Sequence, residues 1–396
     1  MRMKAGEALS QRLVTARRVL SAARRRTGLA VVLLCGLGAA GCSSMPEGML
    51  APVDTVAGAA KVDMLTVTTR AQSEDQAVLF TGDRGSEVGY ANIVVSIPPG
   101  RAVGTVQWPQ SVPGNPAREF VVTRSNRLAH GDLLKWFKER DGGSRRVFVY
   151  IHGFNTSFDR AVFRFAQLAH DSDANAAPVL FSWPSRGRMF DYRRDLDNAS
   201  FSRSDLADLL NIAAKSPAVG EIVILAHSMG SWVAVEALKQ LAIRDGRVPA
   251  KITNVILASP DLDVGVFRRQ VLDMGPKRPQ ITLFVSQADL ALQASAILSR
   301  GSTRLGAVNP DDEDGYAGEL RDLSGVTILD LTALRAGDRI NHSLYAASPE
   351  MVRLIGQRLI EGQVITDADV TPADALGSAA ELVVTAPIRV FEAARR

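Results

Sequence analysis

From residue 145 to residue 362 the chain alternates short, nearly continuous apolar runs with longer stretches of helical spacing. Six runs rich in Val, Ile, Leu and Phe are predicted to be strands, namely residues 145–151, 177–183, 221–226, 252–259, 280–286 and 326–332. Strands that are apolar throughout are buried on both faces, as in a parallel sheet covered by helices on each side. The alternation therefore predicts an α/β fold with a mostly parallel, twisted sheet.

Upstream of these runs, the segments "QAVLFTGDRG", "GYANIVVSIPPG" and "REFVVTRS" are rich in β-forming residues and broken by Gly and Pro. They predict antiparallel strands that open the sheet. The last helix is predicted over "SPEMVRLIGQRLIEG", with Ser348 as N-cap, Pro349 in the first turn and Gly362 as the stop.

Three predicted regions surround or form this domain. Residues 42–75 are small and polar and are predicted to be a flexible tether. The α/β domain is expected over residues 76–365, and the alanine-rich residues 366–396 are expected to be a mobile tail.

The basic character of the chain, with a pI near 9.2, comes from its N-terminus. Residues 1–41 hold eight arginines and lysines against one glutamate, whereas the whole chain has a net charge of +4. The rest of the chain is therefore mildly acidic, and this argues against nucleic acid as a partner.

The basic segment leads into "TGLAVVLLCGLGAAGCSS", an apolar stretch with the length of a signal-peptide core. It ends in Ala39-Ala40-Gly41-Cys42, which resembles a bacterial lipobox although leucine is more usual where Ala39 stands. We expect residues 1–41 to be a lipoprotein signal peptide and Cys42 to be lipidated; an uncleaved anchor helix is the alternative. In lipoproteins, Ser43 after the cysteine favours the outer membrane, facing the periplasm. Cys35 and Cys42 are the only cysteines, so a mature chain could form neither a disulfide framework nor a cysteine-ligated zinc site.

The stretch "VILAHSMGSW" places Ser228 between a predicted strand and a predicted helix. A nucleophile elbow has this arrangement, with small residues where the helix packs on the strand. Gly230 occupies the second small position and Ala226 the first, where glycine is usual. The alternative is that Ser228 only caps the helix.

A serine nucleophile needs a base and an acid that orients it. In the order Ser, Asp, His, the base position falls on His342 in "DRINHSLYAASPE", while His130 and His170 are interpreted as structural. Asp289 follows the strand before the last and is the favoured acid; Asp261 and Asp263 are the alternatives.

An oxyanion hole requires two backbone N–H groups beside the serine. The segment "VYIHGFNTSFD" follows the first strand of the parallel run, and we predict donors at Phe154 and, after the serine, at Met229. His152 is expected to order this loop and not to act as a base. The acidic stretch 309–320 lacks EF-hand spacing and is interpreted as surface, so no metal site is predicted.

Taken together, these motifs resemble the α/β-hydrolase superfamily, and most closely a bacterial branch of hydrolases of unknown function, many of them lipoproteins. The resemblance covers about residues 75–362 and includes "FTGDRG", "VSIPPG" and "FSWPSRGRMFDYRRDLDNA", where Trp183, Pro184, Ser185, Tyr192 and Asp195 stand at recurring positions. Trp183, Ser185 and Tyr192 are candidates for lining the substrate cleft, because this segment leaves the strand beside the elbow. Alternatively, Trp183 belongs to the core and the rest is a solvated loop.

The sequence thus predicts a membrane-tethered serine hydrolase that acts on an ester or related acyl bond of a small-molecule or lipid-like substrate, without a cofactor. A non-catalytic binding protein with the same fold, and an amidase or peptidase, are the alternatives. Chain length of the substrate, a lid and the oligomeric state are left open.

Overall fold

The computed structural model describes residues 45–140, 145–299, 301–312, 314–334, 340–361 and 389–392. Pro46–Arg396 form one compact unit. The predicted signal peptide and the lipidation candidate Cys42 lie outside the described residues. Within the described residues, no helix combines the length and apolar character needed to cross a bilayer.

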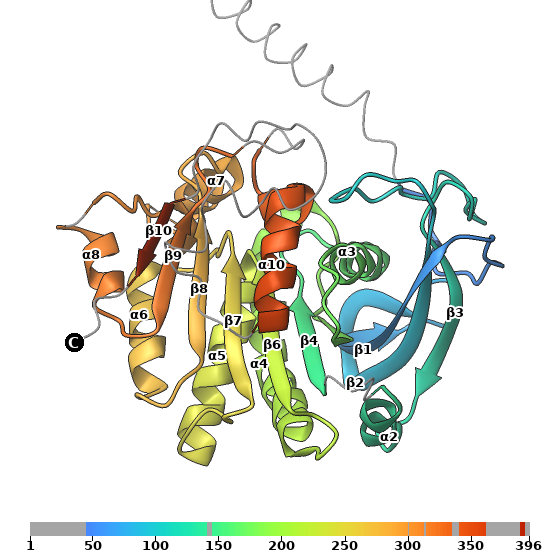
Figure 1. Cartoon of the computed structure of the whole chain (residues 1–396), viewed down its shortest axis with the longest axis horizontal. Helices are drawn as coiled ribbons and strands as arrows, with labels where there is room; N and C mark the ends of the chain where they lie inside the picture. The colour runs from blue at the N-terminus through green and yellow to red at the C-terminus, as the bar shows by residue number, and fades with distance from the viewer. Residues whose placement is uncertain are drawn as a thin grey trace, which may run out of the picture. The chain divides into compact units, whose positions relative to one another are not determined.

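The described strands form a single sheet in the order β10-β9-β8-β7-β6-β4-β5-β1-β2-β3, which runs from the left to the right of Figure 1. Strands β1 and β4 to β9 are parallel, and β2, β3 and β10 add antiparallel pairs at the two edges. Their bounds are β1 Ala60–Gln72, β2 Phe80–Ile97, β3 Val121–Leu128, β4 Arg146–Ile151, β5 Ala177–Ser182, β6 Glu221–His227, β7 Ile252–Ala258, β8 Gln280–Val285, β9 Val326–Asp330 and β10 Arg389–Glu392. The α/β prediction, with a mostly parallel sheet and antiparallel N-terminal strands, is confirmed.

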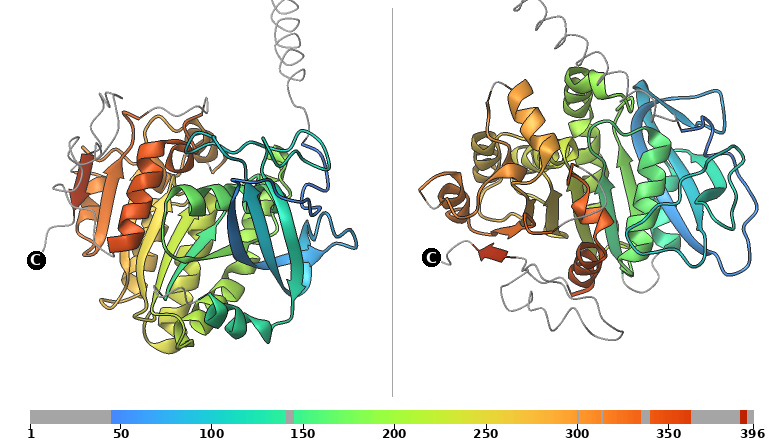
Figure 2. Two further views of the ribbon diagram at one scale, coloured as in Figure 1. Left: turned by 45° about the vertical axis from the view of Figure 1, so that its right-hand side comes forward. Right: turned by 90° about the horizontal axis from the view of Figure 1, so that it is seen from above.

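Helices cover both faces of this sheet (Figure 2). Helices α3 and α10 lie on one face, and α4, α5 and α6 lie on the other. The bounds of the helices are α2 Asp132–Glu139, α3 Phe158–Asp171, η2 Met189–Asp191, α4 Tyr192–Lys215, α5 Met229–Asp245, α6 Val264–Asp273, α7 Leu290–Leu298, η3 Leu305–Ala307, α8 Tyr316–Arg321, α9 Leu344–Ala347 and α10 Pro349–Glu361.

The prediction that residues 42–75 are a tether is wrong for 60–72, because they form β1 inside the sheet. Strand β1 pairs with β2 on one side and with β5 on the other. Residues 64–70 are all buried. The segments "QAVLFTGDRG" and "GYANIVVSIPPG" contribute to one long strand, β2, whose pairing with β1 shifts register twice.

The tail prediction also needs correction at one point. Residues 389–392 form β10, which pairs antiparallel with β9 through Arg389–Asp330 and Glu392–Thr327. The remaining residues of the predicted tail from 366 onward lie outside the described residues.

The apolar strands make the centre of the core. Near the carboxyl ends of β4, β6 and β7, Ile151, Ala226 and Leu257–Ala258 are buried. Helix α3 packs Phe165 on Phe148 and Tyr150 of β4. All parallel strands end at one edge of the sheet, so the loops after them meet there. Every candidate catalytic residue lies on one of these loops.

Candidate active site

Ser228 stands at the sharp turn between β6 and α5. Its φ of 52° and ψ of −124° are unfavourable for a residue with a side chain, so the surrounding packing must hold the turn. A Cβ atom on Gly230 would lie 2.4 Å from the carbonyl oxygen of His152, so only glycine fits this second small position. Ala226 at the first small position is buried and continues the pairing of β6 with β4 and β7.

The side chain of Ser228 does not cap helix α5. No side-chain capping bond is present, and the hydroxyl has no hydrogen-bond partner among the described residues. The residue is 3% exposed. The interpretation of Ser228 as a helix cap is therefore not supported, and its hydroxyl is left available for chemistry.

The loop after β4 lies directly against this turn. A Cβ atom on Gly153 would come within 2.8 Å of both Ser228 Cβ and His227 Nδ1. Within the described part of the chain, the backbone N–H groups of Phe154 and Met229 donate to no protein acceptor. Two free N–H groups on segments that meet at a serine are the kind of donors that can stabilise an oxyanion.

His342 and Asp289 are brought together from segments 53 residues apart. The distance from His342 Nδ1 to Asp289 Oδ2 is 2.7 Å, and Asp289 is buried. Since an ionised carboxylate only accepts, Nδ1 donates and leaves Nε2 free to accept a proton. Asp289 Oδ1 also accepts from the N–H of Leu292, so the carboxylate is fixed as the N-cap of α7.

The alternative acids have other partners. Asp263 caps α6 by accepting from the N–H of Val266. Asp261 accepts from Tyr192 Oη at 3.1 Å and Ser295 Oγ at 2.6 Å, and it is paired with Arg304. Of the three aspartates weighed, only Asp289 contacts His342.

His227 has a role that the sequence did not reveal. Its Nε2 donates to the carbonyl oxygen of His342 at 3.1 Å, and the two rings lie 4.7 Å apart. The ring also packs on Tyr345, whose hydroxyl bonds to that of Tyr150. Burial, followed by the proximity of His342, lowers the pKa of His227 well below its usual value, so it is neutral. The residue before the serine therefore holds the loop of the candidate base beside the elbow.

A second unpredicted feature is the buried guanidinium of Arg70 on β1. It donates to five acceptors, namely Ser182 Oγ (2.8 Å), Ser185 O (2.7 Å), Thr156 O (2.9 Å), Thr81 O (3.2 Å) and His152 Nε2 (3.3 Å). Burial lowers its pKa to about 9, opposed by the carboxylates of Asp195 and Asp159. Arg70 thus links the loops after β4 and β5.

His152 belongs to the same network. Its Nδ1 donates to the carbonyl oxygen of Gly153 at 2.9 Å, which leaves Nε2 to accept from Ser182 Oγ at 3.0 Å. Burial and the charge of Arg70 lower the pKa of His152 to about 3. A neutral, fully bonded imidazole fits the expectation that His152 orders the loop.

The prediction that Trp183 and Ser185 line a substrate cleft is wrong, because both are fully buried. Trp183 stacks on His152 and donates its Nε1 to the carbonyl oxygen of that residue. Ser185 bonds to Asp195 and accepts from the N–H of Thr156. Tyr192 is only partly buried, and its ring lies 5.3 Å from that of Phe154, so it remains a candidate for contact with substrate.

Backbone strain collects around these residues. Of the seven non-glycine residues with positive φ in the described part of the chain, four adjoin the site: Asn155, Ser228, Ser259 and Asn341. Strain of this kind persists only where the surroundings impose it, and it is frequent at active sites.

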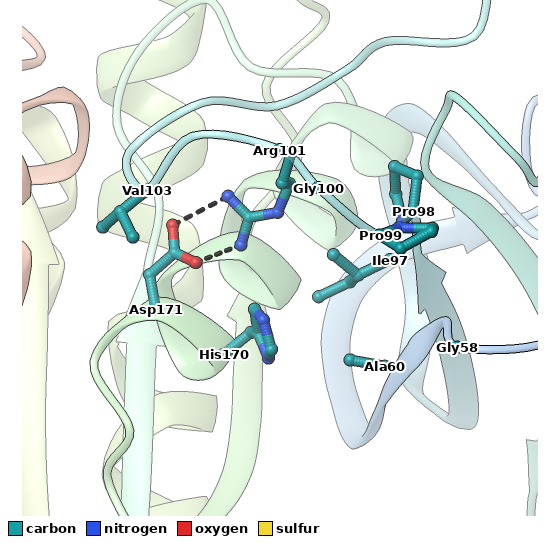
Figure 3. A pocket seen from close by; sticks show the side chains of 10 residues that line it. All are labelled: Gly58, Ala60, Ile97, Pro98, Pro99, Gly100, Arg101, Val103, His170 and Asp171. Atoms are coloured by element: carbon teal, nitrogen blue, oxygen red, sulfur yellow. Dashed lines mark hydrogen bonds and ion pairs between the residues drawn. The ribbon is translucent and has the colours of Figure 1, made fainter.

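A cavity of about 320 Å³ lies elsewhere, at the end of α3 (Figure 3). The side chains of Arg101 and Asp171 form an ion pair in its wall, beside His170 and the Pro98–Pro99 turn. None of the serine, histidine and aspartate candidates lines it. The cavity is therefore separate from the candidate active site.

A mostly parallel sheet with helices on both faces, and a serine at a strained strand–helix turn at its carboxyl edge, define an α/β-hydrolase fold. The chain belongs to the family described as "Alpha/beta hydrolase of unknown function (DUF900)", which matches residues 130–358, more than half of the sequence.

Individual relatives are distant. Over 123 residues the chain is 31% identical to an uncharacterized protein, alr1448, of Nostoc sp. (strain PCC 7120), and the match covers 24% of this chain and 32% of that protein. The match thus spans about a third of the length of that relative.

Among solved structures, a predicted CIB-like hydrolase from Thermoplasma acidophilum aligns at 14% identity and a TM-score of 0.33, covering 76% of this chain and 99% of that one. The siderophore hydrolase EstB from Aspergillus nidulans aligns at 12% identity and a TM-score of 0.34, covering 79% of this chain and 99% of that one. A fungal esterase from Rhizomucor miehei aligns at 12% identity and a TM-score of 0.29, covering 83% of this chain and 88% of that one. Likeness at this level says nothing of substrate.

Proposed function

We propose that this chain is a serine hydrolase that cleaves ester bonds through a triad of Ser228, His342 and Asp289. The observation that carries the proposal is the 2.7 Å contact between His342 Nδ1 and Asp289 Oδ2. The ring of His342 lies 4.7 Å from that of His227, which directly precedes Ser228 and its unbonded hydroxyl. This pair supplies what a serine lacks, namely a base with its accepting nitrogen free and an acid that fixes its tautomer.

The reaction follows from these groups. Ser228 Oγ attacks the carbonyl carbon while its proton passes to His342 Nε2, and Asp289 stabilises the imidazolium through Nδ1–H. The negative charge on the former carbonyl oxygen is held by the N–H groups of Phe154 and Met229. His342 returns the proton to the leaving alcohol, and water activated by the same imidazole releases the acid and restores the serine.

The test compares hydrolysis of a short-chain 4-nitrophenyl ester with that of the matching anilide. Ser228→Ala should lower kcat for the ester by about four orders of magnitude, because the nucleophile is lost. Ser231→Ala is the matched control: Ser231 is buried one turn along α5, and its hydroxyl donates to the carbonyl oxygen of Ala226 and to no other described residue. It should retain activity. Equal rates for wild type and Ser228→Ala would refute the triad, and a faster anilide would assign the enzyme to amides.

We also infer that the chain is anchored to the cell envelope by a lipid on Cys42. Support comes from the sequence, in which a basic segment, an apolar core, small residues and a cysteine follow one another. Radiolabelled palmitate should be incorporated by wild-type chain in bacterial cells and by Cys35→Ser, but not by Cys42→Ser. Labelling of Cys42→Ser would contradict the anchor.

A further inference from the structure

Large apolar side chains are exposed on the segments that lead to and from the candidate triad. Phe190 is 99% exposed and its neighbour Met189 is 71% exposed. We call the group the apolar rim; it consists of Met189, Phe190, Leu290, Ile297, Leu298 and Ile340. Adjacent exposed Met and Phe residues are costly in water and mark surfaces that meet an apolar partner.

The segments of the apolar rim are tied to one another and to the site. Leu290 follows Asp289 directly, and its N–H donates to the carbonyl oxygen of Ile340, two residues before His342. Helix α7, which carries Ile297 and Leu298, also carries Ser295, whose hydroxyl lies 2.9 Å from Tyr192 Oη. The segments of the rim are therefore bonded to the loop of His342 and to Tyr192, on loops that follow the carboxyl ends of the strands.

The connection to η2 runs through the same tyrosine. Met189 and Phe190 precede Tyr192 in the chain, and the ring of Tyr192 packs edge-on against Phe154 of the oxyanion-loop candidate. Phe190 is thus only two residues along the chain from Tyr192, which directly contacts the proposed oxyanion loop.

Charge around η2 indicates what kind of partner fits. Arg188 and Arg193 are exposed and have no ion pair with any described residue, while Arg186 and Arg194 share the single carboxylate of Asp83. Within residues 186–194 four arginines stand against one carboxylate, that of Asp191, so the segment that carries Met189 and Phe190 has a net positive charge.

We propose that the apolar rim docks the active-site face onto an anionic lipid bilayer, with Met189 and Phe190 entering the acyl region and Arg188 and Arg193 meeting lipid phosphates. Exposed apolar residues flanked by arginines have the composition that binds such interfaces. The inference rests on the proposed function and names its substrate class: esters with apolar chains that reach Ser228 from the bilayer.

The kinetic test uses the full chain and two substrates, a short-chain soluble ester and a long-chain ester in vesicles of phosphatidylglycerol and phosphatidylcholine. The double variant Met189→Ser/Phe190→Ser should lower the vesicle rate about tenfold or more and leave the soluble rate within about twofold. Ile243→Ser is the matched control, since Ile243 is 67% exposed near the end of α5 remote from Ser228. Equal loss on both substrates, or no loss on vesicles, would overturn the proposal.

A second readout does not depend on catalysis. In a Cys35→Ser/Cys42→Ser chain, an environment-sensitive fluorophore on Phe190→Cys should shift to the blue on addition of phosphatidylglycerol vesicles and much less with pure phosphatidylcholine. The same label on Ile243→Cys should not respond. If the wild-type chain hydrolyses neither ester but the label responds, the proposed function fails and the docking surface stands.

Two results would refute lipid docking, one from the labelling experiment and one from the oligomeric state of the chain in solution. One is an equal response of both labelled positions. The other is a dimer in lipid-free buffer that Met189→Ser/Phe190→Ser converts to monomer, since the rim would then be covered by a second copy of the chain.

Discussion

The carboxylate of Asp289 accepts hydrogen bonds from two donors, His342 Nδ1 and the N–H of Leu292, so it fixes both an imidazole and the start of α7. Asp289→Asn keeps the shape but offers His342 either a donor or a neutral acceptor, and the imidazolium loses its counter-charge. We predict that kcat falls by about three to four orders of magnitude, measured with the short-chain ester.

Asp261→Asn is the control for this prediction. Asp261 bonds to Ser295, Tyr192 and Arg304 and not to His342, so its substitution should cost less than about tenfold. A larger loss at Asp261 than at Asp289 would exchange their roles.

Arg70 offers a prediction for a residue that does not reach the serine. Lysine cannot replace a planar guanidinium that donates to Ser182, Ser185, Thr156, Thr81 and His152, because its ammonium is a single point of charge. Arg70→Lys should lower kcat about 10- to 100-fold with little change in KM, as the oxyanion loop is displaced.

The control is Arg127→Lys, because Arg127 bonds to the backbone carbonyls of Ser73 and Leu79 away from the site. Added guanidinium should restore part of the activity of Arg70→Ala. Unchanged kcat in Arg70→Lys, with wild-type circular dichroism, would show that the loop does not depend on this residue.

Strand β1 decides where the domain begins. It lies between β2 and β5, so removing it would expose β5 and detach β2 and β3 from the sheet. A chain that starts at residue 46 should unfold cooperatively on heating, whereas one that starts at residue 76 should show no cooperative transition. Equal melting temperatures would mean that β1 is dispensable and that the domain starts as the sequence suggested.

The strands after residue 145 could be predicted because each is apolar along its whole length. β1 could not, because "AKVDMLTVTTRAQ" contains Asp, Arg and three Thr and resembles a polar linker. Its buried polar groups are satisfied by distant segments: Thr68 donates to the carbonyl of Ser182, 114 residues away. Such pairing leaves no trace in local periodicity.

The same reason separates the predicted from the unpredicted parts of the site. Ser228, His342 and Asp289 follow strands and could be placed by their order. The support from Arg70 and the His227 bond to the carbonyl of His342 depends on loops meeting in space. Trp183 and Ser185 were assigned to a cleft because they also follow a strand, although their side chains turn inward to His152 and Asp195.

For the molecule as a whole, burial of neutral histidines predicts loss of stability in acid. The pKa of His152 is about 3 in the folded chain and near 6.5 when unfolded, so only the unfolded state binds the proton between these values. The contribution of His152 to the free energy of unfolding is nearly full above the unfolded pKa of about 6.5 and decreases as the pH falls below it. At pH 5.5 this one residue lowers the free energy of unfolding by about 1.4 kcal/mol. His227, whose pKa is also lowered, acts in the same direction.

Urea unfolding at pH 7.5 and pH 5.5 measures this effect. His152→Gln, which cannot titrate, should lose about 1.4 kcal/mol less than wild type between the two conditions. Parallel losses in both chains would mean that the pKa of His152 is not lowered in the folded chain.

The most direct measurement of the central claim is the site of covalent modification by a fluorophosphonate. The reagent phosphonylates a serine only where a base takes its proton and backbone donors hold the phosphonyl oxygen. Peptide mapping by mass spectrometry should find the adduct on Ser228, with labelling abolished in Ser228→Ala and strongly slowed in His342→Ala, but unchanged in His130→Ala. An adduct on another serine, or labelling that persists in Ser228→Ala, would contradict the assignment of Ser228 as the nucleophile.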